Sequence, residues 1–390
     1  MKRKTLAHII LLVSCFSLRS FSQESKPIQV ALFVSLQLDS AFDASNNYTY
    51  GRSFPKGAIS GLEFYQGALF ALDSLEKTGS KIRFHVFDIK SEQGKIKKIS
   101  SLPVMDSIQL IIGQVSGTDY LQLAGLAERK KIPFISATYP NDGGVKNNPY
   151  VFIVNPKLNS HIQLLFNYLN KNQTNTQIIL FKRTSTGDNR IPELFEEYNR
   201  SSSTILRYQT KTLEDNFNAE AIIKELDSTK ENIIVAGSLD ENFGRNILNA
   251  STLIPKSYAI SLYGMPTWES IKELSRNELK LVPVIYTTSF FNTPDNRVSN
   301  EFEENYRKKT FSRPSDIAYR GYELTWYFCK LIETYGSTLS AHLNTHELFL
   351  ITDFDFRPIF WSKNSSKPDY YENKRIYLIK RLNGIQNRLY

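Results

Sequence analysis

Hydroxyl-bearing turns at the ends of two apolar runs are the residues of this sequence best suited to chemistry. The first turn runs from Gly113 to Thr118 and carries the hydroxyls of Ser116 and Thr118 where a helix is expected to begin. Free backbone N–H groups at a helix N-terminus, together with neighbouring hydroxyls, can bind a small anion. Capping of the helix by these residues explains the pattern about as well, so both interpretations stay open at this point.

The second turn offers similar groups. Ser136, Ala137 and Thr138 end the next apolar run, and Tyr139 adds an aromatic ring. If the two runs form neighbouring strands, the two turns lie side by side and could together hold a carboxylate. The helix N-terminus would contribute about 0.3–1 kcal/mol to the free energy of carboxylate binding, and up to ~2 kcal/mol when the contact is partly buried.

Common catalytic patterns are absent from the sequence. It contains no G-x-S-x-G elbow, no G-x-x-x-x-G-K-[ST] loop, no G-x-G-x-x-G and no H-E-x-x-H. His342 and His346 have a spacing that suits a metal on a helix, but no third ligand lies near them in the sequence, and we interpret them as a solvated pair. The sequence therefore predicts a protein that is not an enzyme, with no metal site and no cofactor.

The elements that must position these turns follow an α/β pattern. Short apolar runs alternate with longer amphipathic runs, as in βαβ units around a parallel sheet. Strands are expected at 30–34, 82–87, 108–112, 134–136, 150–154, 178–181, 233–236 and 284–288. The pattern begins again after Asn155-Pro156, which predicts two Rossmann-like lobes with a hinge and a cleft between them.

The chain length agrees with two lobes, because 390 residues exceed what one hydrophobic core usually supports. We expect three chain crossings. Lobe 1 is predicted to consist of 28–155 plus 285–345, and lobe 2 of 156–284 plus 346–390.

The N-terminus predicts export. Lys2-Arg3-Lys4 precedes an apolar run at 6–18, and the small residues of Ser20-Phe21-Ser22 follow it. This is the order of a secretory signal peptide, which we expect to span residues 1–22. The mature protein would then be periplasmic or otherwise exported.

A second processing site competes with that one. Leu12-Val13-Ser14-Cys15 resembles the lipobox of bacterial lipoproteins, so the alternative is a lipoprotein anchored through Cys15. Cleavage there would leave an apolar segment near the lower limit for a signal peptide, and for this reason we favour cleavage after Ser22. The only other cysteine is Cys329, so no internal disulfide is expected after that cleavage.

The charge excludes some partners. The formal net charge of +9 falls to +5 once the four basic residues of the signal peptide are removed. No dense Lys/Arg cluster interleaved with aromatics is present, so neither nucleic acid nor an anionic membrane surface is predicted as a partner.

The order of several segments resembles the type I periplasmic binding proteins, a family that includes leucine/isoleucine/valine-binding proteins and other substrate-binding proteins of ABC transporters. The segments that carry the resemblance are the Gly113 to Ser116 turn, Lys130-Lys131-Ile132-Pro133, Ser136-Ala137-Thr138, Glu63-Phe64-Tyr65-Gln66-Gly67-Ala68, Val151-Phe152-Ile153-Val154-Asn155-Pro156, Tyr263-Gly264-Met265-Pro266 and Ala318-Tyr319-Arg320-Gly321-Tyr322.

The resemblance implies an exported solute-binding protein that captures a small, carboxylate-bearing, amino-acid-like metabolite between its lobes and passes it to an ABC permease. It places Ser116, Ala137 and Thr138 on the ligand carboxylate, with Thr118 beside them. In the second lobe Ser238 and Asp240 would face the cleft. No residue matches the acidic partner of an amino acid's ammonium group, and Asp240 is the candidate substitute, although a helix N-cap explains it just as well.

A different function on the same fold is the alternative. The chain also resembles outer-membrane lipoprotein activators of peptidoglycan synthases, in which the cleft is vestigial and a surface engages a cell-envelope protein. An aromatic fraction of 13% favours this alternative.

Overall fold

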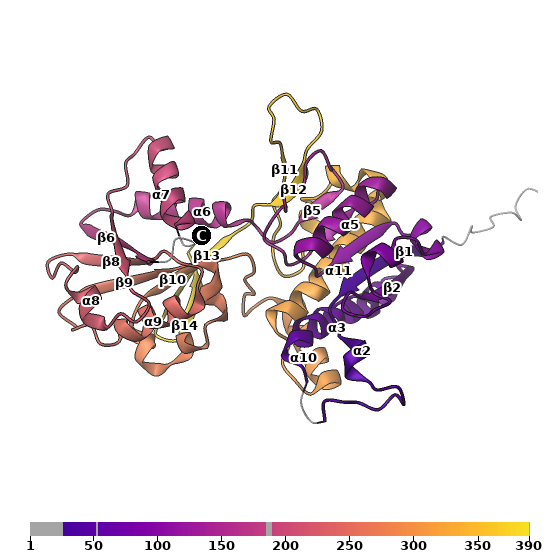
Figure 1. Ribbon diagram of the computed structural model, residues 1–390, viewed down its shortest axis with the longest axis horizontal. Coiled ribbons are helices and arrows are strands. Elements are labelled where there is room, and N and C mark those ends of the chain that lie inside the picture. The colour runs from indigo at the N-terminus through magenta and orange to yellow at the C-terminus, as the bar shows by residue number, and fades with distance from the viewer. Residues whose placement is uncertain (1–25, 52–53, 185–188, 390) are drawn as a thin grey trace, which may run out of the picture.

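The computed structural model describes residues 26–51, 54–184 and 189–389. The predicted signal peptide and Cys15 lie outside the described residues. The chain forms two lobes, each built on a seven-stranded sheet with helices on both faces (Figure 1). This confirms the predicted fold class of two Rossmann-like α/β lobes.

The first sheet has the strand order β11-β12-β5-β4-β3-β1-β2. Its strands are parallel except β11, which runs antiparallel to β12. The central strands are buried on both faces, which explains their continuous apolar runs. The bounds are β1 Ile28–Val34, β2 Ile82–Asp88, β3 Leu110–Gly113, β4 Phe134–Ser136, β5 Val151–Ile153, β11 Phe356–Ile359 and β12 Tyr370–Asn373.

Two long helices of the first lobe, α3 and α11, pack closely against each other. A Cβ atom on Gly67 would lie 2.0 Å from the Ala318 carbonyl oxygen, and one on Gly321 would lie 2.2 Å from that of Phe64. Glycine at both positions therefore permits the close approach of the two backbones. The helices of this lobe are α2 Leu38–Ala41, α3 Lys56–Lys77, α4 Ile96–Ile99, α5 Gly117–Lys130, α10 Arg297–Thr310 and α11 Asp316–Tyr335, with 3-10 turns at Pro103–Asp106, Gly336–Ala341 and His346–Leu348.

The second sheet has the order β14-β13-β10-β9-β8-β6-β7, so it repeats the arrangement of the first. Its strands are β6 Thr176–Arg183, β7 Gln209–Leu213, β8 Glu231–Ala236, β9 Ala259–Gly264, β10 Val284–Thr288, β13 Tyr377–Leu382 and β14 Ile385–Arg388. Its helices are α6 Leu158–Lys171, α7 Arg190–Ser201, α8 Ala219–Ile223 and α9 Glu241–Ser251, with 3-10 turns at Pro266–Ser270, Lys272–Ser275 and Asn277–Leu281.

The chain crosses between the lobes three times, but two crossings differ from the predicted boundaries. Strand β10 pairs with β9, so residues 284–288 belong to the second lobe and not to the first. Strands β11 and β12 extend the first sheet through the pairing of β12 with β5, and the chain enters the second lobe only at β13. Local sequence pattern does not show which sheet a strand joins, because that choice is made by non-local pairing.

The direction of the last strands shows which edges face the hinge. Strand β12 is parallel to β5, so it ends at the carboxyl edge of the first sheet. Strand β13 is antiparallel to β10 and pairs its first residue, Tyr377, with Thr288 at the end of β10. The carboxyl edges of both sheets therefore meet at the crossings, which is where open α/β sheets bind ligands.

The structure locates Cys329 and the two histidines that the sequence analysis considered. Cys329 is buried within α11. His342 stacks on Tyr335 with a ring separation of 3.7 Å, while His346 contacts Phe349, so the two histidines do not share one regular helix. Within the described ranges, no group of three or more His, Cys, Asp or Glu side chains is placed to hold a metal ion. No helix in these ranges has the length and apolar character needed to cross a membrane.

Candidate functional site

A cavity of about 460 Å³ lies between the lobes, at the first two crossings. Its volume is within the range of sites for small molecules. The lining residues come from both lobes and from the crossings: Tyr139, Pro140, Asn141, Asn155, Pro156, Leu158, His161, Leu239, Pro266, Thr267, Glu269, Thr288, Ser289 and Arg320.

The predicted first-lobe residues lie at adjacent strand ends. Gly113 of β3 is in register with Ser136 of β4, so the turns that follow these two strands are neighbours. Ser116 is the exposed N-cap residue of α5, and its side chain makes no capping hydrogen bond. Thr118 in the first turn of α5 is also exposed. The hydroxyls of this turn are therefore accessible to a ligand.

The two predicted residues of the second turn differ in their accessibility to a ligand. Ala137 is fully buried, and its N–H donates to the carbonyl of Gly113, so that N–H is not available to a ligand. Thr138 is half-buried, and its carbonyl accepts a hydrogen bond of 3.0 Å from Asn155 in the first crossing. Neither residue lines the 460 Å³ cavity, but the next residue, Tyr139, does.

The predicted second-lobe residues serve the start of α9. Asp240 is the N-cap residue, and its carboxylate accepts the N–H of Phe243 at 2.8 Å. The same carboxylate lies 3.4 Å from Arg183. The hydroxyl of the buried Ser238 accepts the N–H of Asp240 at 3.0 Å. The capping interpretation of Asp240 is therefore the one that its contacts bear out.

An acidic residue that the sequence prediction missed lies in the cavity. Glu269 is on the 3-10 turn that follows β9, and its carboxylate accepts a hydrogen bond of 2.8 Å from the hydroxyl of Thr288. Although Glu269 reaches solvent in the cleft, the surrounding protein raises its pKa to about 7, against the opposing charge of Arg320. The signal for it was the strand end at Tyr263-Gly264, followed within a few residues by a carboxylate.

A buried histidine forms part of the second-lobe wall. His161 of α6 is 4% exposed, and its Nδ1 lies 3.0 Å from the hydroxyl of Thr287. Burial, with a smaller contribution from the charge of Arg320, lowers its pKa to about 3. His161 is therefore neutral at physiological pH and presents a polar but uncharged ring.

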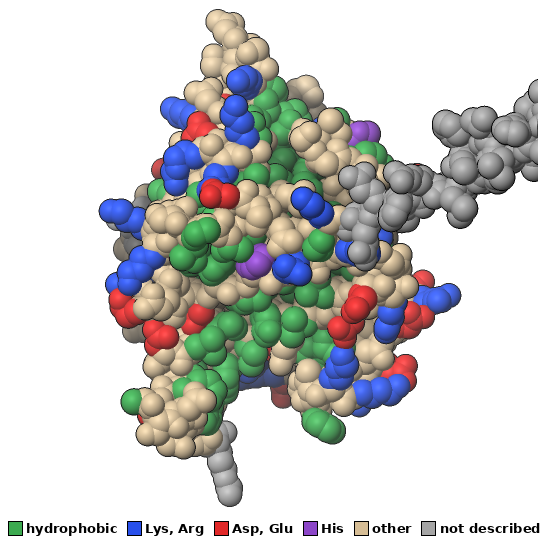
Figure 2. All heavy atoms as spheres, turned by 90° about the vertical axis from the view of Figure 1, so that its right-hand side faces the viewer, with side chains coloured by type: hydrophobic (Ala, Val, Ile, Leu, Met, Phe, Trp, Pro, Cys, Tyr) green, Lys and Arg blue, Asp and Glu red, His purple; other side chains and the backbone are tan. Residues whose placement is uncertain are grey.

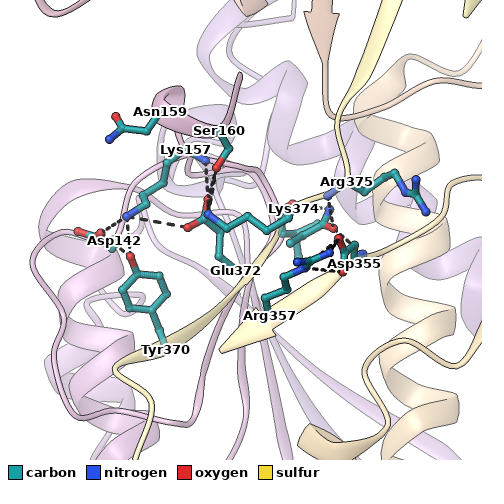
Figure 3. A network of polar contacts seen from close by, with 12 residues as sticks. Asp142, Lys157, Asn159, Ser160, Asp355, Arg357, Tyr370, Glu372, Lys374 and Arg375 are labelled. Atoms are coloured by element: carbon teal, nitrogen blue, oxygen red, sulfur yellow. Dashed lines mark hydrogen bonds and ion pairs between the residues drawn. The ribbon is translucent and has the colours of Figure 1, made fainter. Parts of the chain in front are cut away.

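A polar network joins the lobes behind the cavity (Figure 3). Lys157, in the first crossing, contacts Asp142 at 2.7 Å and the hydroxyl of Tyr370 at 2.6 Å. Burial alone would raise the pKa of Asp142, but the hydrogen bonds from Lys157, Gly144 and Tyr370 outweigh it, so the pKa lies below its usual range. Asp142 is therefore a carboxylate paired with Lys157.

The same network anchors the start of α6. Glu372 of β12 is fully buried and accepts the N–H of Lys157 at 3.1 Å and the hydroxyl of Ser160 at 3.2 Å. Lys374, in the third crossing, lies 2.9 Å from the same carboxylate (Figure 3). A first-lobe carboxylate thus contacts the start of a second-lobe helix and two of the crossings.

Comparisons with known proteins agree with this architecture. A family model described as "Periplasmic binding protein" matches residues 55–346, which is most of the chain. No curated protein matches the sequence.

Solved structures with similar folds include several amino acid transport proteins. One is an ABC transporter substrate-binding protein from Desulfitobacterium hafniense in complex with Leu, at 16% identity and a TM-score of 0.57 over 93% of this chain and 100% of that one. The LivJ protein of Streptococcus pneumoniae with isoleucine has 15% identity and a TM-score of 0.55, covering 93% and 99%. A putative branched-chain amino acid ABC transporter from Rhodospirillum rubrum has 12% identity and a TM-score of 0.69, covering 93% and 100%.

These identities show the fold, while the family model, which matches parts of both lobes and the first two crossings, shows the family. The chain belongs to the periplasmic binding protein family.

Proposed function

We propose that this protein is an exported solute-binding protein that captures a small, amino-acid-like metabolite between its lobes and delivers it to an ABC permease. The observation that carries the proposal is the interlobe cavity, to which the first lobe contributes Tyr139 and the second lobe contributes Glu269. The accessible hydroxyls of Ser116 and Thr118 do not line this cavity, but they lie at the strand end beside the one that leads to Tyr139. The titles of the similar structures name leucine and isoleucine as their ligands, which supports this class of compound.

The two ends of an amino acid would contact different lobes. Ser116, Thr118 and the N-terminus of α5 supply donors for the carboxylate, and the Thr138 hydroxyl adds another from the next strand end. Glu269 accepts from the ammonium group, because Asp240 already caps α9 and lies near Arg183. A ligand that contacts both lobes at once stabilises the closed arrangement over the open one.

Thermal-shift screening with a panel of amino acids and related carboxylates tests this function. A ligand at 100 times its dissociation constant adds about 2.7 kcal/mol to the free energy of unfolding, which raises the melting temperature. Thr138→Val should weaken binding of the best ligand by roughly 1–3 kcal/mol, since a ligand acceptor loses its hydroxyl partner. Ser101→Ala, at an exposed serine outside the two turns, is the control. Unchanged affinity in both Thr138→Val and Ser116→Ala would place the ligand elsewhere.

One observation favours the alternative of a cell-envelope interaction module. Hydrophobic side chains lie in a broken band down the face of the first lobe that Figure 2 shows. The exposed hydrophobic residues of this lobe include Leu69, Leu102 and Leu121. Such a surface suits contact with a partner protein. If no metabolite in the panel shifts the melting temperature, this function becomes the better proposal.

A further inference from the structure

An arginine in the wall of the cavity lacks a carboxylate partner. Arg320 of α11 is 7% exposed and lines the cavity. Its guanidinium donates to the hydroxyl of Ser289 and to the side-chain oxygen of Asn155, at 2.5 and 3.4 Å, and lies over the ring of Phe290. These partners are all neutral, and Arg320 makes no ion pair within 4.0 Å in the part of the chain that the structure describes.

Three carboxyl groups lie near enough to interact with Arg320, but none forms a salt bridge with it. Burial raises the pKa of Glu269 and of Glu323 to about 7, while Arg320 opposes the rise in both cases. Asp316 also has a raised pKa, for the same reason and with the same opposition. Glu269 and Glu323 are therefore only partly ionised near neutral pH, whereas a guanidinium stays fully charged.

The fixed orientation of Arg320 suits an anion from the cavity. Its two hydrogen bonds use a small share of the five guanidinium donors, and the partners that accept them, Ser289 and Asn155, belong to the second and first crossings. A buried cation with neutral partners alone is costly, and a carboxylate that binds two guanidinium N–H groups compensates it best. Such a contact would form beside the hinge.

We propose that the ligand carries a second acidic group and that Arg320 binds it, so that the preferred class is an acidic amino acid or a dicarboxylate of similar size. This inference rests on the proposed function. The α-carboxylate occupies the turns at Ser116 and Thr138, the ammonium group faces Glu269, and the second carboxylate reaches Arg320. A neutral side chain in the same place leaves the guanidinium without a carboxylate in direct contact.

Calorimetric titration of the full mature protein with four amino acids tests the inference. L-Glutamate and L-aspartate are compared with L-glutamine, which is nearly the same shape as glutamate but neutral, and with L-leucine. We expect the best acidic ligand to bind about tenfold or more tightly than either neutral one, because a charged bidentate contact replaces a neutral one. This comparison uses the wild-type protein and needs no variant.

Substitution of Arg320 tests whether this residue causes the preference for acidic over neutral amino acids. Arg320→Gln should reduce the ratio of glutamate affinity to glutamine affinity to about one, while Arg320→Lys should retain part of the preference for the acidic ligand. Far-UV circular dichroism and the melting temperature check that both variants fold. Tighter binding of leucine or glutamine than of either acid by the wild type, or an acid preference that persists in Arg320→Gln, overturns the inference and leaves the proposed function standing. If none of the four binds and no related carboxylate binds either, the proposed function itself fails.

Discussion

The turns after β3 and β8 occupy the same place in two equivalent sheets, yet their polar groups are used differently. In the first lobe, the N-cap residue Ser116 makes no side-chain capping bond and is exposed. In the second lobe, the N-cap residue Asp240 accepts the N–H of Phe243 and lies 3.4 Å from Arg183. A repeated topology therefore leaves an exposed hydroxyl without a capping role in the first lobe, while the same position in the second lobe stabilises a helix.

Each lobe also buries one ionisable group that a hydroxyl partner leaves without a counter-charge in direct contact, a carboxyl in the first lobe and an imidazole in the second. Glu323 of α11 in the first lobe is 3% exposed, and its carboxylate accepts the N–H and the hydroxyl of Thr352. His161 of α6 in the second lobe is buried with the hydroxyl of Thr287 as its partner. Because burial favours the neutral form of each group, the two lobes should lose stability in opposite directions of pH.

The largest expected effect is at Glu323. Its folded pKa of about 7 lies above the ordinary value of 4.5, so the stability that it contributes is full below pH 4.5 and is lost as the pH rises through 7. The loss in the wild type is about 3 kcal/mol, since each unit of pKa difference is worth about 1.4 kcal/mol. Chemical denaturation at pH 5 and pH 8 should show a smaller difference for Glu323→Gln. An unchanged difference, equal to that of the exposed-site control Glu347→Gln, would contradict the buried carboxyl.

His161 should show the opposite dependence. The pKa of His161 is about 3 in the folded protein, below the ordinary value of 6.5. As the pH falls below 6.5, this histidine is protonated in the unfolded chain but stays neutral in the folded protein. The wild type should lose about 2 kcal/mol between pH 6.5 and pH 5 from this residue. Denaturation of His161→Gln should lack that loss, and His346→Gln, at an exposed histidine, should retain it. Loss of the pH dependence in the control alone would contradict the assignment.

Ligand affinity distinguishes the two second-lobe carboxylates. Glu269→Gln should weaken amino acid binding about tenfold or more, because a charged acceptor for the ammonium group is lost. Asp240→Asn should leave affinity nearly unchanged, since asparagine caps a helix about as well as aspartate does. Calorimetry on both variants gives the comparison. A larger loss of affinity in Asp240→Asn than in Glu269→Gln would mean that Asp240 binds the ammonium group.

The smallest expected effect separates binding from capping. Asp240→Ala should lower the free energy of unfolding by about 1 kcal/mol through loss of the cap on α9. Ser116→Ala should change stability by less than about 0.5 kcal/mol, because its hydroxyl makes no capping bond. Urea denaturation of both variants measures this. An equal loss of stability in the two would mean that both turns serve mainly to cap helices.

The sequence predicted the neighbouring strand ends of the first lobe. Apolar runs followed by hydroxyls are visible locally at Ser116 and Thr138, and the register of Gly113 with Ser136 places the two strand ends side by side. Ligand binding by these hydroxyls stays a prediction. Glu269 was missed because its place in the cleft depends on a 3-10 turn and on the facing lobe. Arg320 was missed because the spacing of Tyr322 and Cys329 marks one apolar face of α11 but does not reveal a charged residue that points into a cleft.

The lobe boundaries show the same limit. An apolar run predicted β10, and no strand was predicted at the position of β12. Which sheet each of these strands joins is decided by its pairing, with β9 for β10 and with β5 for β12. The alternation of strands and helices therefore predicted the fold class and left the last two crossings misplaced.

A crystal structure of the mature protein with its tightest-binding amino acid would test capture between the lobes most directly. We expect the ligand carboxylate within hydrogen-bond distance of the Ser116 and Thr138 hydroxyls, and its ammonium group on Glu269, with the lobes closed around it. A ligand that contacts one lobe alone, or that lies outside the cavity lined by Glu269 and Arg320, would contradict the proposal.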